Sequence, residues 1–123
     1  MHSFVLADWT SAAAPAGTSF TQDESGWLDL ASFQDVVIYL TVSEVSASPT
    51  IAFETSPCRE DALFQPMVSM VMTSAAPQPN VLRAVMLGST VPLARYLRWK
   101  ITTGGGAWDA TFRALVTANS PGM

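Results

Sequence analysis

Two long stretches of the chain alternate between apolar and polar positions with the two-residue period of a β-strand. In residues 35–57 an apolar row comprises Val36, Ile38, Leu40 and Val42. In residues 93–116 one row comprises Leu97, Trp99 and Ile101, and the opposite row comprises Tyr96, Arg98 and Lys100. Because successive side chains of a strand point to opposite faces, the apolar rows predict strands with one face in a core, and the mixed row of the second stretch is expected to face outward.

Shorter strands are predicted before, between and after these stretches. The expected segments are residues 3–9, 18–22, 51–55, 65–73, 81–88 and 108–117, and residues 26–33 are expected as a strand edge that leads through a turn into the strand at Asp35. The pattern of residues 65–73 also allows a helix, but their short length and β-branched content favour a strand. Small residues and turn formers separate the segments at residues 11–17, 23–26, 46–49, 75–80 and 104–106. In the strand after Pro49, Ile51, Phe53 and Thr55 are expected to point inward, and Glu54 outward.

This order of elements predicts an all-β protein. No amphipathic helical crossover lies between the strand segments, so parallel α/β folds are excluded. The expected architecture is a two-sheet antiparallel β-sandwich with eight or nine strands, jelly-roll-like or immunoglobulin-like. A chain of 123 residues has the usual size of one domain, so residues 1–123 are expected to form a single β-sandwich domain.

Charge is scarce and unevenly distributed. Charged residues make up 13% of the chain, about half the typical share, which favours assembly only modestly. Residues 1–54 carry seven acids and no Lys or Arg, whereas residues 55–123 carry six bases and three acids. The two halves could attract each other between identical subunits, or pair neighbouring strands within one subunit, and the second interpretation is favoured. The acidic total disfavours nucleic-acid binding.

Candidate catalytic and metal-binding groups are few. Cys58 is the single cysteine, and the single histidine, His2, lies beside the first residue, so a nucleophile held by a base is not expected. The Gly104–Gly106 run lacks the lysine and helix of a phosphate loop and predicts a hairpin turn. Asp23, Glu24 and Asp29 lack the spacing of a calcium loop. We therefore expect no enzyme, no metal and no cofactor.

The first residues have neither a basic region nor a long apolar run, which predicts a soluble protein made in the cytoplasm, with no membrane partner. Trp99 and Trp108 lie on inward rows and are expected in the core. Trp9 and Trp27 could instead form a stacking platform for sugars. A carbohydrate-binding module that uses Trp9, Trp27 or Tyr39 is therefore an alternative function.

An ordered set of short motifs follows the strand pattern over residues 26–116. It consists of Leu28, Asp29, Leu30, Thr55, Ser56, Pro57, Tyr96, Arg98, Lys100 and Phe112. In this order the chain resembles small β-sandwich structural proteins of tailed phages and prophage-like elements. It departs from their pattern at residues 58–60, where an Asp-Gly type of turn is expected, and in the Met-rich segment 67–72.

The resemblance implies a non-enzymatic virion protein, most simply a capsid decoration or cement protein, with a small tail component as another possibility. Such a protein is made in the host cytoplasm, resides in the virion, forms homo-oligomers with a trimer favoured, and binds a major capsid or other shell protein. The N-terminal segment, the loop at residues 75–80 and the basic row are the expected contact elements. Their candidate partner-binding residues are Phe4, Leu6, Trp9, Pro77, Pro79, Arg95, Arg98 and Lys100.

Overall fold

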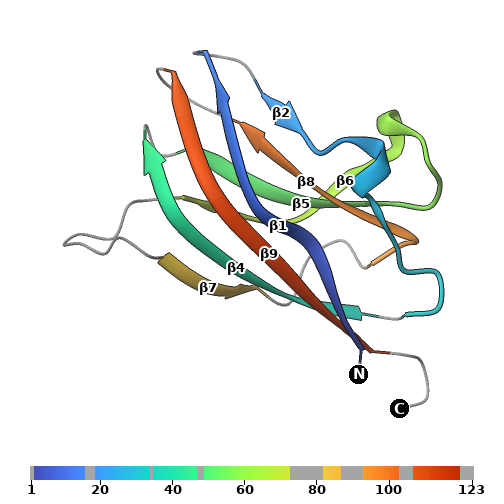
Figure 1. Ribbon diagram of the computed structural model, residues 1–123. Helices are drawn as coiled ribbons and strands as arrows, with labels where there is room; N and C mark the ends of the chain where they lie inside the picture. Colours follow the sequence, from blue (N-terminus) through green and yellow to red (C-terminus); the bar gives the residue numbers. More distant parts are fainter. Residues whose placement is uncertain are drawn as a thin grey trace.

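The computed structural model describes residues 2–15, 19–33, 35–46, 49–72, 82–86, 93–102 and 107–119, and these build an all-β molecule (Figure 1). Within these ranges, two short 3-10 turns are the only helical elements, and no helix is long and apolar enough to cross a membrane. The elements are β1 (His2–Ala14), β2 (Phe20–Thr21), η1 (Glu24–Gly26), β3 (Leu28–Asp29), β4 (Asp35–Ser46), β5 (Thr50–Ser56), η2 (Asp61–Leu63), β6 (Gln65–Val71), β7 (Leu82–Met86), β8 (Tyr96–Thr102) and β9 (Trp108–Asn119).

The strands form two antiparallel sheets that face each other. Sheet A has the order β1-β9-β4-β7, and sheet B has the order β2-β8-β5-β6. Strand β3 pairs with β8 at Leu97, and β2 pairs with the same strand at Ile101, so the two short segments behave as one interrupted strand. With β2 and β3 counted as one strand, the eight strands have the order β1-β9-β4-β7 in one sheet and β2-β8-β5-β6 in the other. This is the order of a jelly roll, which confirms the predicted β-sandwich and selects it over the immunoglobulin-like alternative.

The predicted apolar rows fill the space between the sheets. The core residues of β4, β8 and β9 are Val36, Ile38, Leu40, Val42, Leu97, Trp99, Ile101, Trp108, Ala110, Phe112, Ala114, Val116 and Ala118. The rings of Trp99 from sheet B and Phe112 from sheet A meet edge to face, with centroids 4.9 Å apart. Trp99 and Trp108 are therefore core residues, as predicted.

A glutamine joins the two sheets along one side. Gln22 is 8% exposed, and its Nε2 donates to the Leu6 carbonyl oxygen of β1 at 2.9 Å. Its Oε1 accepts a hydrogen bond from the Trp99 N–H of β8. Gly26 passes so close that a Cβ there would lie 2.7 Å from Gln22 Nε2, so a larger residue would displace the Gln22 amide.

Strand β1 is longer than predicted. The segment 11–17 was expected to be a loop because alanine and proline disfavour strands, but Ser11–Ala14 continue β1 and pair with Asp109 and its neighbours in β9. The pairing of β1 with β9 is interrupted by two register shifts, between Val5 and Ala7 and between Ala7 and Thr10. Such bulges bend a long strand so that it can follow its partner. Residues 26–33 have the expected strand edge followed by a turn, since Leu28 and Asp29 pair and a turn at residues 31–32 precedes β4.

The outward side of sheet B is also covered, which corrects part of the predicted alternation. Glu54, Tyr96 and Arg98 were expected to face solvent, yet they are 8%, 7% and 4% exposed. The turns that contain η1 and η2 fold over this side, and the rings of Trp27 and Phe64 lie against it. Strands β5 and β8 therefore have two buried faces, which a two-residue alternation does not reveal.

Candidate interaction surface

The outer face of sheet A carries a row of apolar side chains that crosses three strands. The pairing registers place Val5 of β1 opposite Leu115 of β9, and Leu115 opposite Tyr39 of β4. Val5 is 57% exposed and Tyr39 is 43% exposed, so this row faces away from the core. Together with Phe4, the row lines a hollow of about 330 Å³ that is predominantly apolar.

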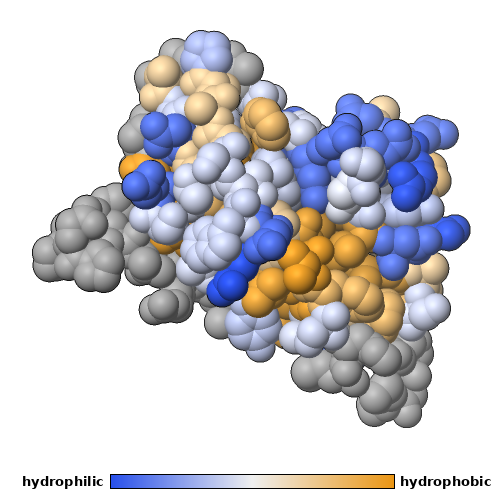
Figure 2. All heavy atoms as spheres, in the orientation of Figure 1, coloured by the Kyte–Doolittle hydropathy of each residue, from blue (hydrophilic) through white to orange (hydrophobic). Residues whose placement is uncertain are grey.

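Figure 2 shows this face of the molecule, with an apolar area over the lower halves of β1 and β9 near the N-terminus. Polar neighbours of the row along the strands are Ser3, Thr41, Arg113 and Thr117. We name the face formed by Val5, Trp9, Tyr39, Arg113 and Leu115 the sheet A face. A contiguous exposed apolar area is typical of a protein contact.

A tryptophan and an arginine extend the sheet A face toward its upper end. Trp9 is 49% exposed, and the guanidinium carbon of Arg113 lies 5.1 Å from the centre of its ring. The Nε of Arg113 is buried without a hydrogen-bond partner. Within the described part of the chain, Arg113 makes no ion pair. This cation therefore packs on the Trp9 ring without an ion pair to any described residue.

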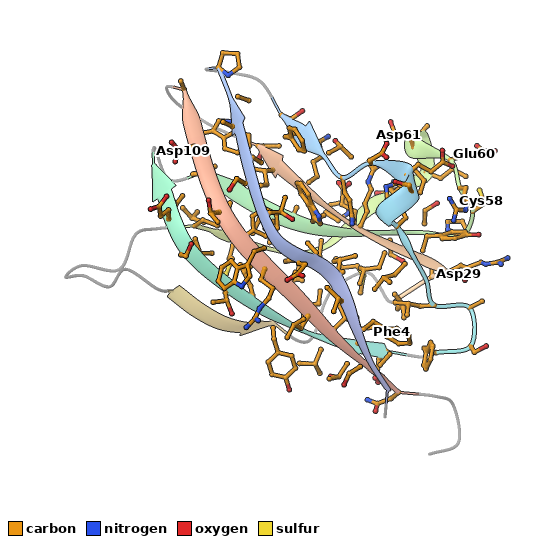
Figure 3. All side chains as sticks on the ribbon, viewed as in Figure 1. Phe4, Asp29, Cys58, Glu60, Asp61 and Asp109 are labelled. Carbon is orange, nitrogen blue, oxygen red and sulfur yellow. The ribbon has the colours of Figure 1, made fainter. Side chains whose placement is uncertain are left out.

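Carboxylates occupy the two ends of the same face. At the lower end, Asp35 pairs with Asn119, whose Nδ2 donates to the Asp35 carboxylate at 2.8 Å. At the upper end Glu44 is exposed, and so is Asp109, which Figure 3 shows far from Phe4. As far as its side chains are described, the sheet A face thus has a largely apolar middle that carries Arg113, with the exposed Asp8 next to Trp9, and it has acidic ends. Arg83 of β7 occupies the register position opposite Thr41 of β4.

Arg98, one of the candidate contact residues, is a buried structural group. Its Nε donates to Glu54 Oε1 at 2.9 Å, and its NH1 donates to Asp61. The guanidinium carbon lies 3.9 Å from the ring centre of Phe64 and 5.3 Å from that of Trp27. Arg98 therefore points to the outer side of sheet B, as expected, but its expected exposure is wrong because the two turns enclose it.

Arg95 is exposed, but it too is engaged inside the subunit. Its Nε and NH2 donate to the two oxygens of Asp29 at 3.1 and 2.9 Å. This hydrogen bonding lowers the pKa of Asp29 and raises the pKa of Arg95. Arg59 also pairs with Glu24, at 3.6 Å. These pairs join the acidic and basic halves of the chain within one subunit, which confirms the intramolecular interpretation of the charge asymmetry for them.

The other candidate contact residues lie in different surroundings. Leu6 is 4% exposed and belongs to the core, because its side chain points between the sheets. Phe4 is half-buried and meets the ring of Phe33 with centroids 5.3 Å apart. Lys100 is half-buried and makes no ion pair with any described residue. Pro77 and Pro79 lie outside the described residues.

The candidates for sugar stacking are separated from one another. Trp9 and Tyr39 are both exposed on the sheet A face, whereas Trp27 lies on the other sheet against Phe64, with ring centroids 4.7 Å apart. Arg113 and Leu115 were not singled out by sequence reasoning. The alternation of the C-terminal strand could have identified them, since both occupy outward positions of a strand whose inward positions form the core.

Cys58 lies in a tight turn after β5. It is half-buried, and its carbonyl oxygen accepts a hydrogen bond from the Ser56 hydroxyl at 2.6 Å. Figure 3 shows it at the edge of the sandwich with Asp29, Glu60 and Asp61. Among the described side chains, no group of three or more His, Cys, Asp or Glu residues could hold a metal ion. Gly104–Gly106 lie outside the described residues.

The strand order and the two packed sheets define the chain as a jelly-roll β-sandwich. Over 98% of its length it is similar to the solved structure of the infectious bursal disease virus VP2 subviral particle, with a TM-score of 0.50 and 12% sequence identity. The structure of the infectious bursal disease virus Gx strain matches the same share of the chain, with a TM-score of 0.46 and 10% identity. The chain spans about a third of the length of these proteins, 33% in each case. No protein-family model matches the chain, and no curated protein matches it.

Proposed function

We propose that this chain is a non-enzymatic structural protein of a virus particle that oligomerises and binds a protein shell as a decoration or cement protein. The observation that carries the proposal is the jelly-roll strand order, a fold that viral capsid domains use. The likeness to the VP2 subviral particle supports it at the level of the fold. The same proposal places the protein in the virion, with a major capsid or other shell protein as its partner.

The exposed apolar row supports a role in assembly. Val5 and Tyr39 keep about half of their surfaces in solvent, and such side chains stabilise a protein when a partner covers them. Contacts repeated over many symmetric sites make weak individual contacts sufficient for attachment to a shell.

Co-sedimentation tests this function. Particles from the source of this chain, stripped of the protein, are mixed with the purified protein and pelleted, and the bound fraction is measured against protein concentration. We expect saturable binding at a fixed ratio of copies to shell subunits. Protein that stays in the supernatant with every particle preparation from its source, while a known shell component pellets, would contradict the proposal.

A carbohydrate-binding module is the second candidate function. The observation that favours it is the exposure of Trp9 and Tyr39 on one face, with Arg113 packed against Trp9. Aromatic faces of this kind stack on sugar rings. A glycan array separates the two functions: binding to a defined glycan that is lost in Trp9→Ala supports the module, and an empty array argues against it.

A further inference from the structure

The sheet A face carries Arg113, which makes no ion pair with any described residue, near its middle and carboxylates at its ends. We propose that this face binds the same face of a second copy of the chain. The two copies are related by a two-fold axis that lies in the plane between their facing A sheets and runs perpendicular to the strands. The inference deepens the proposed function, on which it rests for the expectation that the protein oligomerises. It assigns that oligomerisation to one surface.

The charges of the face are complementary to themselves in this arrangement. Asp35 pairs with Asn119 at the end of β9, and Arg113 lies six residues earlier on that strand, about 20 Å away. A two-fold axis midway between these positions brings Arg113 of each copy against Asp35 of the other. Glu44 and Asp109 then lie beyond the overlap, where water solvates them.

The same axis covers the apolar row. Val37, which lies two positions before Tyr39 on β4, is half-buried and points to the same face. The axis passes between these two positions, so Tyr39 of one copy packs near Val37 of the other. A parallel alignment of the strands would instead place Arg113 against its own counterpart, which like-charge repulsion disfavours.

The size of the overlap sets the expected strength of the dimer. Three strands (β1, β9 and β4) about 4.8 Å apart run through the overlap, which spans positions 113–119 of β9; at about 3.3 Å per residue they give a projected area of about 330 Å² per copy. The accessible surface of protruding side chains exceeds their projection, but the overlap stays below the roughly 800 Å² per partner of a standard interface, which corresponds to a weak, concentration-dependent dimer. An isologous pairing uses this area once on each subunit and closes without forming filaments.

The first experiment measures mass by sedimentation velocity over a range of concentrations. Wild type is expected at an even multiple of the 13.1 kDa chain, in contrast to the trimer that the family resemblance implied. Tyr39→Lys is expected to weaken association at least about tenfold, because it places a charge in the apolar middle. Leu63→Lys is the matched control, since Leu63 is equally exposed at 43% but belongs to η2 on the other sheet. It is expected to leave the mass unchanged.

The second experiment exchanges the charges. Asp35→Arg and Arg113→Asp are each expected to weaken association on the order of tenfold, because each places like charges together. The double variant Asp35→Arg/Arg113→Asp is expected to restore association, since both contacts are then re-formed with reversed sign. A double variant weaker than both single variants would overturn the proposed axis.

Other outcomes also decide the inference. A wild-type monomer at every concentration, a wild-type trimer, or an oligomer that Leu63→Lys breaks and Tyr39→Lys does not would each overturn it. If Tyr39→Lys abolishes co-sedimentation with particles while the mass stays unchanged, the sheet A face binds the shell instead of a second copy. That result refutes this inference and leaves the proposed function standing. An even oligomer that never binds particles supports this inference and contradicts the proposed function.

Discussion

Arg98 shows how a single side chain can look like a contact residue and serve the interior. Its guanidinium lies between two aromatic rings and binds the carboxylates of Glu54 and Asp61. The side chain is 4% exposed, and that of Glu54 is 11% exposed. A pair buried to this extent stabilises the fold only when both members are present.

Replacing Arg98 should therefore be costly. We expect Arg98→Met to lower the free energy of unfolding by about 3–5 kcal/mol, because Glu54 is left buried without its partner. Urea unfolding followed by tryptophan fluorescence measures the loss. Arg95→Met is the control, since it removes an arginine whose ion pair is exposed, and it should change the midpoint little. Equal losses in the two variants would contradict a structural role specific to Arg98.

At the scale of elements, the sheets are tied together through Gln22 between β1 and β8. Changing Gln22 to Leu keeps a similar volume but leaves the Leu6 carbonyl and the Trp99 N–H without their partner. We expect Gln22→Leu to lower the free energy of unfolding by about 1–3 kcal/mol. Chemical denaturation measures it, with Ser25→Ala as the control because Ser25 is exposed and bonds only within its turn. Stability equal to that of the control would refute this role.

The elements also show which part of the structure follows from local pattern. The inward rows of β4, β8 and β9 were predicted because alternation depends only on neighbouring residues. The burial of Tyr96 and Arg98 was not predicted, because it depends on turns about 35 to 70 positions away that fold over the same strand.

The residues of the sheet A face were only partly predicted, for the same reason. Trp9 was predicted as a contact residue, while Leu115 and Arg113 were not. Their importance depends on strand pairing between the two ends of the chain, which places Leu115 between Val5 and Tyr39. A single sequence does not specify such long-range registers.

At the scale of the whole molecule, the ion pairs make stability depend on acid. Hydrogen bonds from Arg95 and Arg98 lower the pKa values of Asp29 and Asp61 below their ordinary value of 3.8. A lowered pKa in the folded state means that the unfolded state binds more protons as the pH falls. The stabilisation is therefore complete above about pH 5 and is lost as the pH falls through the folded pKa values.

The double variant Asp29→Asn/Asp61→Asn tests this dependence. It should be less stable than wild type at neutral pH, and the difference should shrink as the pH falls from about 5 to about 2. Thermal unfolding at a series of pH values measures both curves. A constant difference across this range would show that the two carboxylates contribute no acid dependence.

The pairing of β1 with β9 has a practical consequence for any tagged or fused form of this chain. Because His2 lies opposite Ala118, the first and last strands start and finish at the same corner of the sandwich (Figure 1). That corner adjoins Ser3 and Val5 on the sheet A face. A purification tag or fused cargo at either terminus would stand beside the apolar row and obstruct its partner. Association should therefore be measured after tag removal, and a bulky fusion at either end offers a steric means of keeping the copies apart.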